Sequence, residues 1–131
     1  MRLNRQFVQR FALVTVVMAA LGLSSVALAA GGVAGTYTTM IKSPSDLKGK
    51  WVLTLAKSGS YAVALNGKVI ARGRYSATAT TITLREPAGC GGSGTYAWKR
   101  SGKTMTFLRK REAPSCQVRA AVLAHRFTQV R

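Results

Sequence analysis

Residues 49–67 read GKWVLTLAKSGSYAVALNG, and this stretch determines the fold class. Large apolar side chains take every second position on either side of a short turn, at Trp51, Leu53 and Leu55 and then at Tyr61, Val63 and Leu65. Period-two alternation is typical of β-strands with one buried face. The stretch ends in Asn66-Gly67, a pair that suits a two-residue hairpin because both positions accept positive φ. We therefore predict two antiparallel strands that lead into a tight hairpin.

The same rhythm continues on both sides of this stretch. It predicts further strands at Gly35–Ile41, at Val69–Tyr75, around Ile82 and Leu84, around Tyr96 and Trp98, around Met105 and Phe107, and at Phe127–Val130. In the strand after the hairpin, the predicted inward face holds Val69, Ala71, Gly73 and Tyr75. Gln117 to Arg126 has helical spacing instead.

These elements predict an all-β fold with short turns. We expect an antiparallel up-and-down meander of seven to eight short strands that closes into a small barrel, with a short helix near the C-terminus. Closure would remove the two exposed edges of the sheet. A flattened sandwich is the alternative.

The first residues have the pattern of a Sec signal peptide. Arg2, Arg5 and Arg10 precede an apolar run of 13 residues from Phe11 to Leu23, and Ala27-Leu28-Ala29 provides small residues for cleavage. We predict a leader at residues 1–29 and a domain at residues 30–131, with cleavage after Ala27 as the second choice. An uncleaved anchor is the alternative, but a membrane span needs roughly 20 apolar residues. The mature protein is expected to be secreted or to stay in the periplasm or cell envelope, without a transmembrane segment.

The chain has two cysteines, Cys90 and Cys116, and both follow the leader. In an exported chain this predicts a disulfide, which would stabilise the fold by roughly 3 kcal/mol on the chain-entropy model. A metal site is the alternative reading, but His125 is the only histidine and no zinc-binding pattern is present. We predict no metal and no cofactor.

The charge is strongly basic, with 20 Lys and Arg against three acids, Asp46, Glu86 and Glu112. Without the three leader arginines the net charge is +14, that is 17 minus 3. Such a charge attracts polyanions over a long range. The outward positions and turns predict a basic patch at Arg72, Arg74, Arg85, Lys99, Arg109, Lys110 and Arg111. A merely solvated charged face is the alternative.

Gly49-Lys50-Trp51 at the start of a long strand resembles the Gly-x-Trp signature of the lipocalin and calycin group of small β-barrels. The repeated pairs Gly35-x-Tyr37, Gly59-x-Tyr61 and Gly73-x-Tyr75 make the chain similar to short secreted bacterial lipocalin-like domains. The resemblance implies an antiparallel barrel, a central cavity for a small apolar ligand, and a late arginine across the tryptophan. Arg119 or Arg126 could take that part, and Arg119 completes the predicted signature with Gly49 and Trp51.

The inward faces contain the candidate cavity-lining residues Leu53, Tyr61, Val63, Tyr75, Tyr96, Trp98 and Phe107. An apolar, aromatic lining is usual for a ligand pocket. A barrel of about eight strands is also narrow enough for side chains to fill it. A ligand cavity and a filled core are therefore both open alternatives, and the oligomeric state is not predicted.

The chain lacks the residues of a recognisable catalytic site, and we predict that it is not an enzyme. A carboxylate pair needs two placed acids, but Asp46 and Glu86 are far apart in sequence and Glu112 lies in a basic run. All three acids are expected to pair with nearby lysine or arginine side chains. A hydrolytic triad needs a histidine oriented by a carboxylate, and a lone His125 is more often structural. Two binding functions remain: a secreted module for a small apolar ligand, and a basic adhesion module for extracellular polyanions or cell-envelope polymers.

Overall fold

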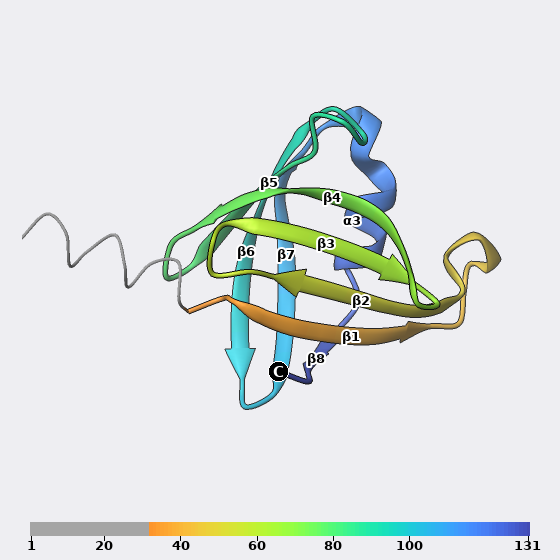
Figure 1. Ribbon diagram of the computed structural model, residues 1–131, viewed down its shortest axis with the longest axis horizontal. Helices are drawn as coiled ribbons and strands as arrows, with labels where there is room; N and C mark the ends of the chain where they lie inside the picture. Colours follow the sequence, from red (N-terminus) through yellow and green to blue (C-terminus); the bar gives the residue numbers. More distant parts are fainter. Residues whose placement is uncertain (1–31) are drawn as a thin grey trace, which may run out of the picture.

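Residues 32–131, which the computed structural model describes, form a closed barrel of eight antiparallel strands (Figure 1). The strands are β1 (Gly35–Ile41), β2 (Gly49–Leu55), β3 (Ser60–Leu65), β4 (Lys68–Ala77), β5 (Thr81–Arg85), β6 (Ser93–Ser101), β7 (Thr104–Glu112) and β8 (Phe127–Gln129). Each strand pairs with the next one in sequence. The predicted meander and barrel are therefore confirmed. The predicted leader and its cleavage positions lie outside the described residues.

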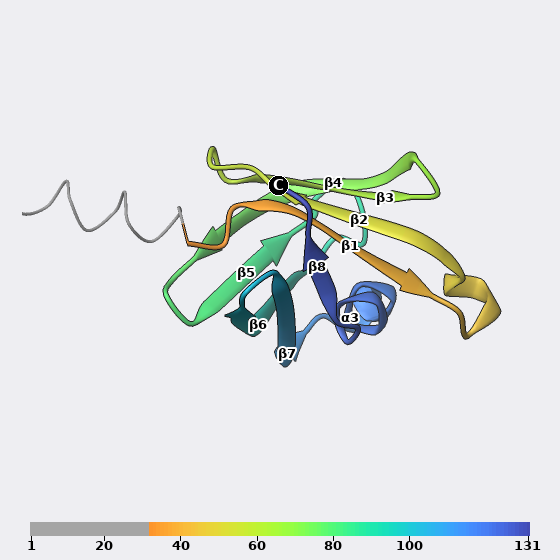
Figure 2. The same ribbon diagram turned by 90° about the horizontal axis from the view of Figure 1, so that it is seen from below.

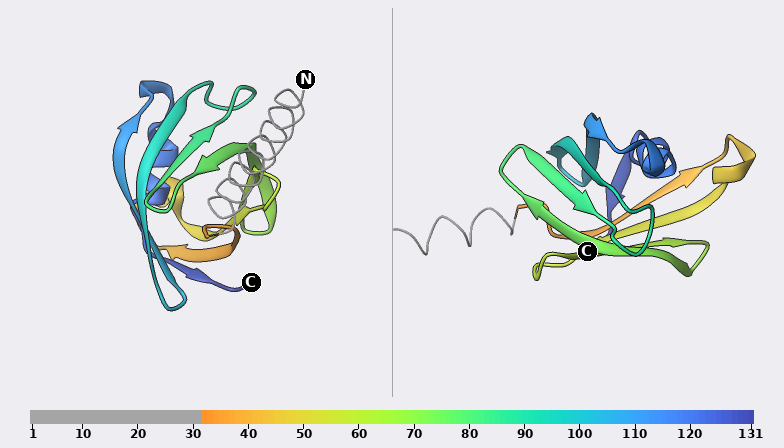
Figure 3. Two further views of the ribbon diagram at one scale, coloured as in Figure 1. Left: turned by 90° about the vertical axis from the view of Figure 1, so that its left-hand side faces the viewer. Right: turned by 90° about the horizontal axis from the view of Figure 1, so that it is seen from above.

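The shortest strand closes the barrel. Thr128 in β8 lies opposite Thr38 of β1 on one side and Thr104 of β7 on the other. The helix α3 (Gln117–Leu123) comes just before β8 and follows the 3₁₀ turn η2 (Pro114–Cys116); another such turn, η1 (Ser45–Leu47), joins β1 to β2. Figure 2 shows α3 beneath β1 and β2, and Figure 3 shows it beside β7. Within residues 32–131, no helix combines the length and apolar character needed to cross a membrane.

Much of the interior is filled by large side chains. Tyr37, Leu55, Ile82, Tyr96 and Met105 are each at most 1% exposed. The Phe107 and Phe127 rings meet edge to face, with centroids 5.9 Å apart. This packing comes directly from the alternation in the sequence, because every one of these residues occupies an inward position of its strand.

One strand departs from simple alternation. Val63 of β3 lies opposite Ala71 of β4, but the next residue, Ala64, lies opposite Val69. Ile70 is therefore the extra residue of a β-bulge, which shifts the alternation by one position. Val69 then shares the outer face with Ala64, so the prediction that Val69 points inward is wrong. The sequence gives no sign of this shift, because Val69 and Ile70 are both apolar.

Candidate functional site

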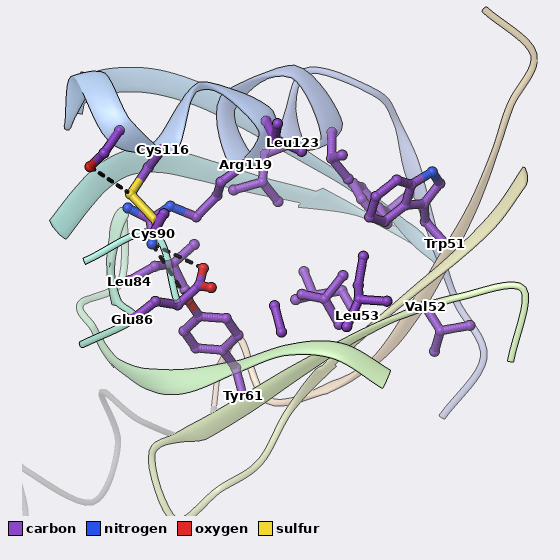
Figure 4. Close-up of a pocket in the computed structure, with 17 residues that line it drawn as sticks. Trp51, Val52, Leu53, Tyr61, Leu84, Glu86, Cys90, Cys116, Arg119 and Leu123 are labelled. Carbon is purple, nitrogen blue, oxygen red and sulfur yellow. Dashed lines mark hydrogen bonds and ion pairs between the residues drawn. A yellow bond between two sulfur atoms is a disulfide. The ribbon is translucent and has the colours of Figure 1, made fainter. Parts of the chain in front are cut away.

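A pocket of about 250 Å³ lies between α3 and the inner faces of β2 to β5 (Figure 4). Its lining is mostly apolar and comprises Trp51, Val52, Leu53, Tyr61, Val63, Ile70, Ala71, Leu84, Glu86, Cys90, Ser115, Cys116, Val118, Arg119, Val122, Leu123 and Phe127. The barrel is thus filled in one part and hollow in another. The two alternatives that the sequence left open, a filled core and a ligand cavity, thus each describe one part of the barrel.

The hollow part lies where one wall ends in a small side chain, that of Ala71. Leu53, Val63 and Ala71 lie opposite one another across β2, β3 and β4. Ala71 has only a methyl group to extend into the space that faces α3. At the rim, Ile70 is 51% exposed and Val118 is 61% exposed. The pocket therefore opens to solvent between two apolar side chains.

A buried arginine forms the polar end of the pocket. Arg119 Nη2 donates to Glu112 Oε1 at 2.6 Å and Arg119 Nε donates to Glu112 Oε2 at 2.9 Å. Its Nη1 donates to Glu86 Oε2 at 3.2 Å and to the Tyr61 hydroxyl at 3.5 Å, while Nη2 also donates to the Gly92 carbonyl at 3.1 Å. A guanidinium has five N–H donors, so this network uses all of them.

Two glycines make room for this network. A Cβ atom at Gly94 would collide with the carboxylate of Glu112, its partner across β6 and β7. A Cβ atom at Gly73 would collide with the ring of Tyr61, its partner across β3 and β4. Both strands therefore carry glycine where a polar group must lie flat against the sheet.

The network is mostly buried and internally satisfied. The side chains of Arg119, Glu86 and Glu112 are 8%, 7% and 1% exposed. Glu112 also accepts from the Tyr96 hydroxyl and from the backbone N–H of Ala113. Within residues 32–131, every buried polar side-chain atom has a hydrogen-bond partner. The cluster has two carboxylates and one guanidinium, so its net charge is −1.

The surroundings shift the pKa values of four members. Burial alone would raise the pKa of Glu112, but hydrogen bonds from Arg119, Tyr96 and Ala113 lower it below its ordinary value. Burial would lower the pKa of Arg119, but Glu112 and Tyr61 raise it. Burial and the neighbouring carboxylates raise the pKa of both phenols, Glu86 acting on Tyr61 and Glu112 on Tyr96. At neutral pH the phenols are therefore uncharged.

The predicted disulfide forms one wall of the pocket. Cys90 and Cys116 are bonded, with Cα atoms 5.2 Å apart and 26 residues apart in sequence. Cys116 immediately precedes α3, and Cys90 lies in the loop between Glu86 and Gly92. The bond therefore ties the helix that carries Arg119 to the loop that supplies two of its acceptors.

The predicted signature residues are separated in space. Gly49 begins β2, and Trp51 is buried with its indole N–H donating to the Leu47 carbonyl at 2.7 Å. Arg119 lies at the other end of the pocket from Trp51 (Figure 4). The expected placement of Arg119 across the tryptophan therefore does not describe this chain. Arg126 is exposed on the outer side, close to Thr38 and Lys50.

Three of the predicted cavity residues, Leu53, Tyr61 and Val63, line the pocket. The other predicted residues do not: Tyr75, Tyr96 and Phe107 belong to the filled core, and Trp98 packs against it. The sequence reasoning missed the wall formed by α3. It also missed that Glu86 and Glu112 both pair with Arg119. Acidic residues are scarce in this basic chain, and that scarcity is a signal that each has a specific structural role.

The predicted basic patch is brought together only in part. Arg74 and Arg85 lie directly opposite each other on β4 and β5, with Arg72 two residues along the same outer face. Arg111 lies on β7 opposite Thr95, two strands beyond β5.

The remaining members of the predicted patch lie apart from these. Lys99 is further along β6, Lys110 is the extra residue of a bulge in β7, and Arg109 donates to Gln117 of α3 at 3.4 Å. The group Arg72, Arg74 and Arg85 is called the β4–β5 arginine face below.

No protein-family model matches the chain, and no curated protein or solved structure shows significant similarity to it. Among residues 32–131, no three histidine, cysteine or acidic side chains lie together as a metal site. The fold and the pocket therefore rest on the chain's own geometry.

Proposed function

We propose that this protein is a secreted, non-catalytic binding module with a lipocalin-like barrel, and that its pocket holds a small apolar ligand. The observation that carries the proposal is the pocket of about 250 Å³ with apolar walls and an open apolar rim. Ligand sites are typically concave and mainly apolar, with a few placed polar groups. The Gly49-x-Trp51 opening and the predicted leader support the lipocalin-like and exported parts of the proposal.

The volume restricts the size of the ligand. An apolar cavity of roughly 150 Å³ binds benzene, whereas pockets for drug-sized ligands begin at roughly 300 Å³. A pocket of about 250 Å³ lies between these limits. The ligand is therefore of the size of one ring with a short substituent, or a comparable short chain.

Toluene is expected to bind the purified protein saturably and to shift the amide NMR signals of Leu53, Val63 and Leu84. Replacing Ala71 with phenylalanine should weaken this binding at least about tenfold, because the new ring would occupy the space in front of α3. Each factor of ten corresponds to about 1.4 kcal/mol of binding free energy.

The matched control is Ala97→Phe. Ala97 lies between Thr81 and Leu108 in the barrel wall and does not line the pocket. This variant should bind toluene as the unaltered protein does. Absence of saturable binding, or equal binding by the Ala71 and Ala97 variants, would contradict the pocket function.

A second candidate function rests on the outer surface. All Lys and Arg side chains within residues 32–131 are exposed except Arg119, and Asp46 is the one exposed acid among them. Removing Arg119 and the three leader arginines from the 20 basic residues leaves 16 exposed cations. Like charges directly opposite on neighbouring strands are destabilising, so Arg74 beside Arg85 is unfavourable without an anionic partner. We propose that the β4–β5 arginine face binds a polyanion.

The triple variant Arg72→Gln, Arg74→Gln and Arg85→Gln is expected to elute from heparin at clearly lower salt than the unaltered protein. The slope of log K against log salt should fall by about 2 to 3, since each contact to an anionic group adds about one unit. The control is Lys42→Gln, Lys68→Gln and Lys103→Gln, which removes the same charge from scattered exposed positions. Equal losses in both triples would show that only net charge matters.

A further inference from the structure

The polar end of the pocket is negative, whereas the rest of the molecule is positive. Glu86, Tyr61 and Arg119 all line the pocket, and Glu112 lies directly behind Arg119. Two carboxylates face one guanidinium, and the phenols of Tyr61 and Tyr96 add no charge at neutral pH. A ligand that enters the pocket therefore meets a local charge of −1 behind apolar walls.

The donors at this end are already used. All five N–H groups of Arg119 bind carboxylate, phenol or backbone oxygens. A ligand carboxylate would find no free guanidinium donor and would lie close to Glu86. Its desolvation in the pocket would not be compensated, because a buried charge needs a partner of opposite sign.

The acceptors at this end retain capacity. The hydrogen bond from Arg119 to Glu86 goes to Oε2. A hydrogen bond between the Tyr61 hydroxyl and Glu86 also contributes to the raised pKa of Tyr61. A carboxylate has two oxygens with about four lone-pair sites, so Glu86 can still accept from a further donor. Figure 4 shows its carboxylate between Tyr61 and Arg119 at the edge of the hollow. Glu86 is thus the group that a ligand can reach with an N–H or O–H.

We infer that the ligand carries a hydrogen-bond donor, as an ammonium or hydroxyl group, and that carboxylate ligands of the same size are rejected. This inference rests on the proposed pocket function and adds the chemical class of the ligand. Glu86 is the residue that would accept from the donor, and the apolar walls would hold the ring or chain. The pocket would thus favour a cationic or neutral donor, whereas the basic outer surface alone would favour an anion.

The test compares three probes of nearly equal size, benzylamine, benzyl alcohol and benzoate, in about 0.15 M salt, where surface charges are screened beyond about 8 Å. Benzylamine, as the ammonium ion, is expected to bind at least about tenfold more tightly than benzoate, with benzyl alcohol in between. In Glu86→Gln the difference between amine and carboxylate should shrink to about threefold or less, because the network is then neutral.

Asp46→Asn is the matched control, since it removes the same charge from an exposed turn and should leave the ranking unchanged. If Glu86→Gln fails to fold, the ranking of the three probes on the unaltered protein decides alone. Equal binding of all three probes, or tightest binding by benzoate, would overturn this inference and leave the pocket function standing. If toluene and all three probes fail to bind, the pocket function itself is refuted.

Discussion

Replacing Arg119 with methionine is expected to lower the free energy of unfolding by about 3 to 5 kcal/mol, the usual result of removing one partner from a buried ion pair. Methionine keeps a similar stem but leaves Glu86 and Glu112 buried without a cation. Small domains have a total stability of about 5 to 15 kcal/mol, so the loss is a large part of the whole. Denaturant unfolding followed by tryptophan fluorescence would measure it.

Arg74→Met is the matched control, because it removes the same charge from an exposed position of β4. Its effect should stay within about 0.5 kcal/mol, as for most surface substitutions. The free energy of unfolding of Arg119→Lys should lie between those of the two methionine variants, since lysine keeps the charge but its ammonium has three donors in place of the five of the planar guanidinium. A stability of Arg119→Met close to that of Arg74→Met would contradict the assigned role of the network.

The pH dependence separates this electrostatic role from a simple packing loss. In the unaltered protein the pKa of Glu112 is lowered from its ordinary value of 4.5, so its contribution to stability is complete above that pH and is lost as the pH falls through the lowered value. Without Arg119, burial and the neighbouring carboxylate would raise the pKa of Glu112 above 4.5. The methionine variant should therefore become more stable as the pH is lowered from 7 to 5, whereas the stability of the unaltered protein should change little over this range.

The sequence predicted the barrel well because the barrel depends on a local signal. Each strand reports its own buried face by alternation, and the Asn66-Gly67 turn sets the pairing of its neighbours, with Asn66 at φ 51° and Gly67 at φ 85°. Closure then follows from the need to remove edges. The bulge at Ile70 was missed because the two neighbouring residues, Val69 and Ile70, are both apolar. A shift of the alternation by one residue therefore leaves no trace in the sequence pattern.

The site was less accessible to sequence reasoning because it depends on non-local geometry. Arg119 comes from α3, Glu86 from the residue that follows β5, and Glu112 from the end of β7, so the three meet only after the barrel has closed. The expectation that the acids pair with basic residues is confirmed for Glu86 and Glu112, whereas Asp46 forms no ion pair within residues 32–131. These residues include 17 cations, and no local rule selects Arg119 as the partner. The hollow depends in the same way on the short Ala71 side chain facing α3.

The resemblance in the sequence predicted the architecture but misplaced one side chain. The Gly49-x-Trp51 pattern correctly marks the start of a strand of the antiparallel barrel, β2. Arg119 then had two potential partners, the Trp51 ring or the buried acids. The acids prevail because two carboxylates supply full opposite charges and hydrogen-bond acceptors for a buried guanidinium, whereas an aromatic face supplies only the weaker attraction of its ring quadrupole.

Replacing both cysteines with alanine is expected to cost about 3 kcal/mol of stability, because the disulfide restricts a long loop of the unfolded chain. It closes the segment that contains β6 and β7, with a sequence separation of 26 residues. Denaturant unfolding of C90A/C116A should show the loss. Treating the unaltered protein with dithiothreitol should give a similar loss, whereas the same reagent should leave the double variant unchanged.

The same change should weaken ligand binding more than its distance from the apolar wall suggests. Without the disulfide, the loop after Glu86 remains attached to α3 through weaker contacts, such as the hydrogen bond from Arg119 to the Gly92 carbonyl. The polar end would then sample open arrangements, and the apparent affinity falls with the populated fraction of the closed one. Toluene, which needs only the apolar walls, should lose less affinity than benzylamine, which needs Glu86 in place. An equal loss for both probes would show that the disulfide supports the barrel as a whole rather than the polar end of its pocket.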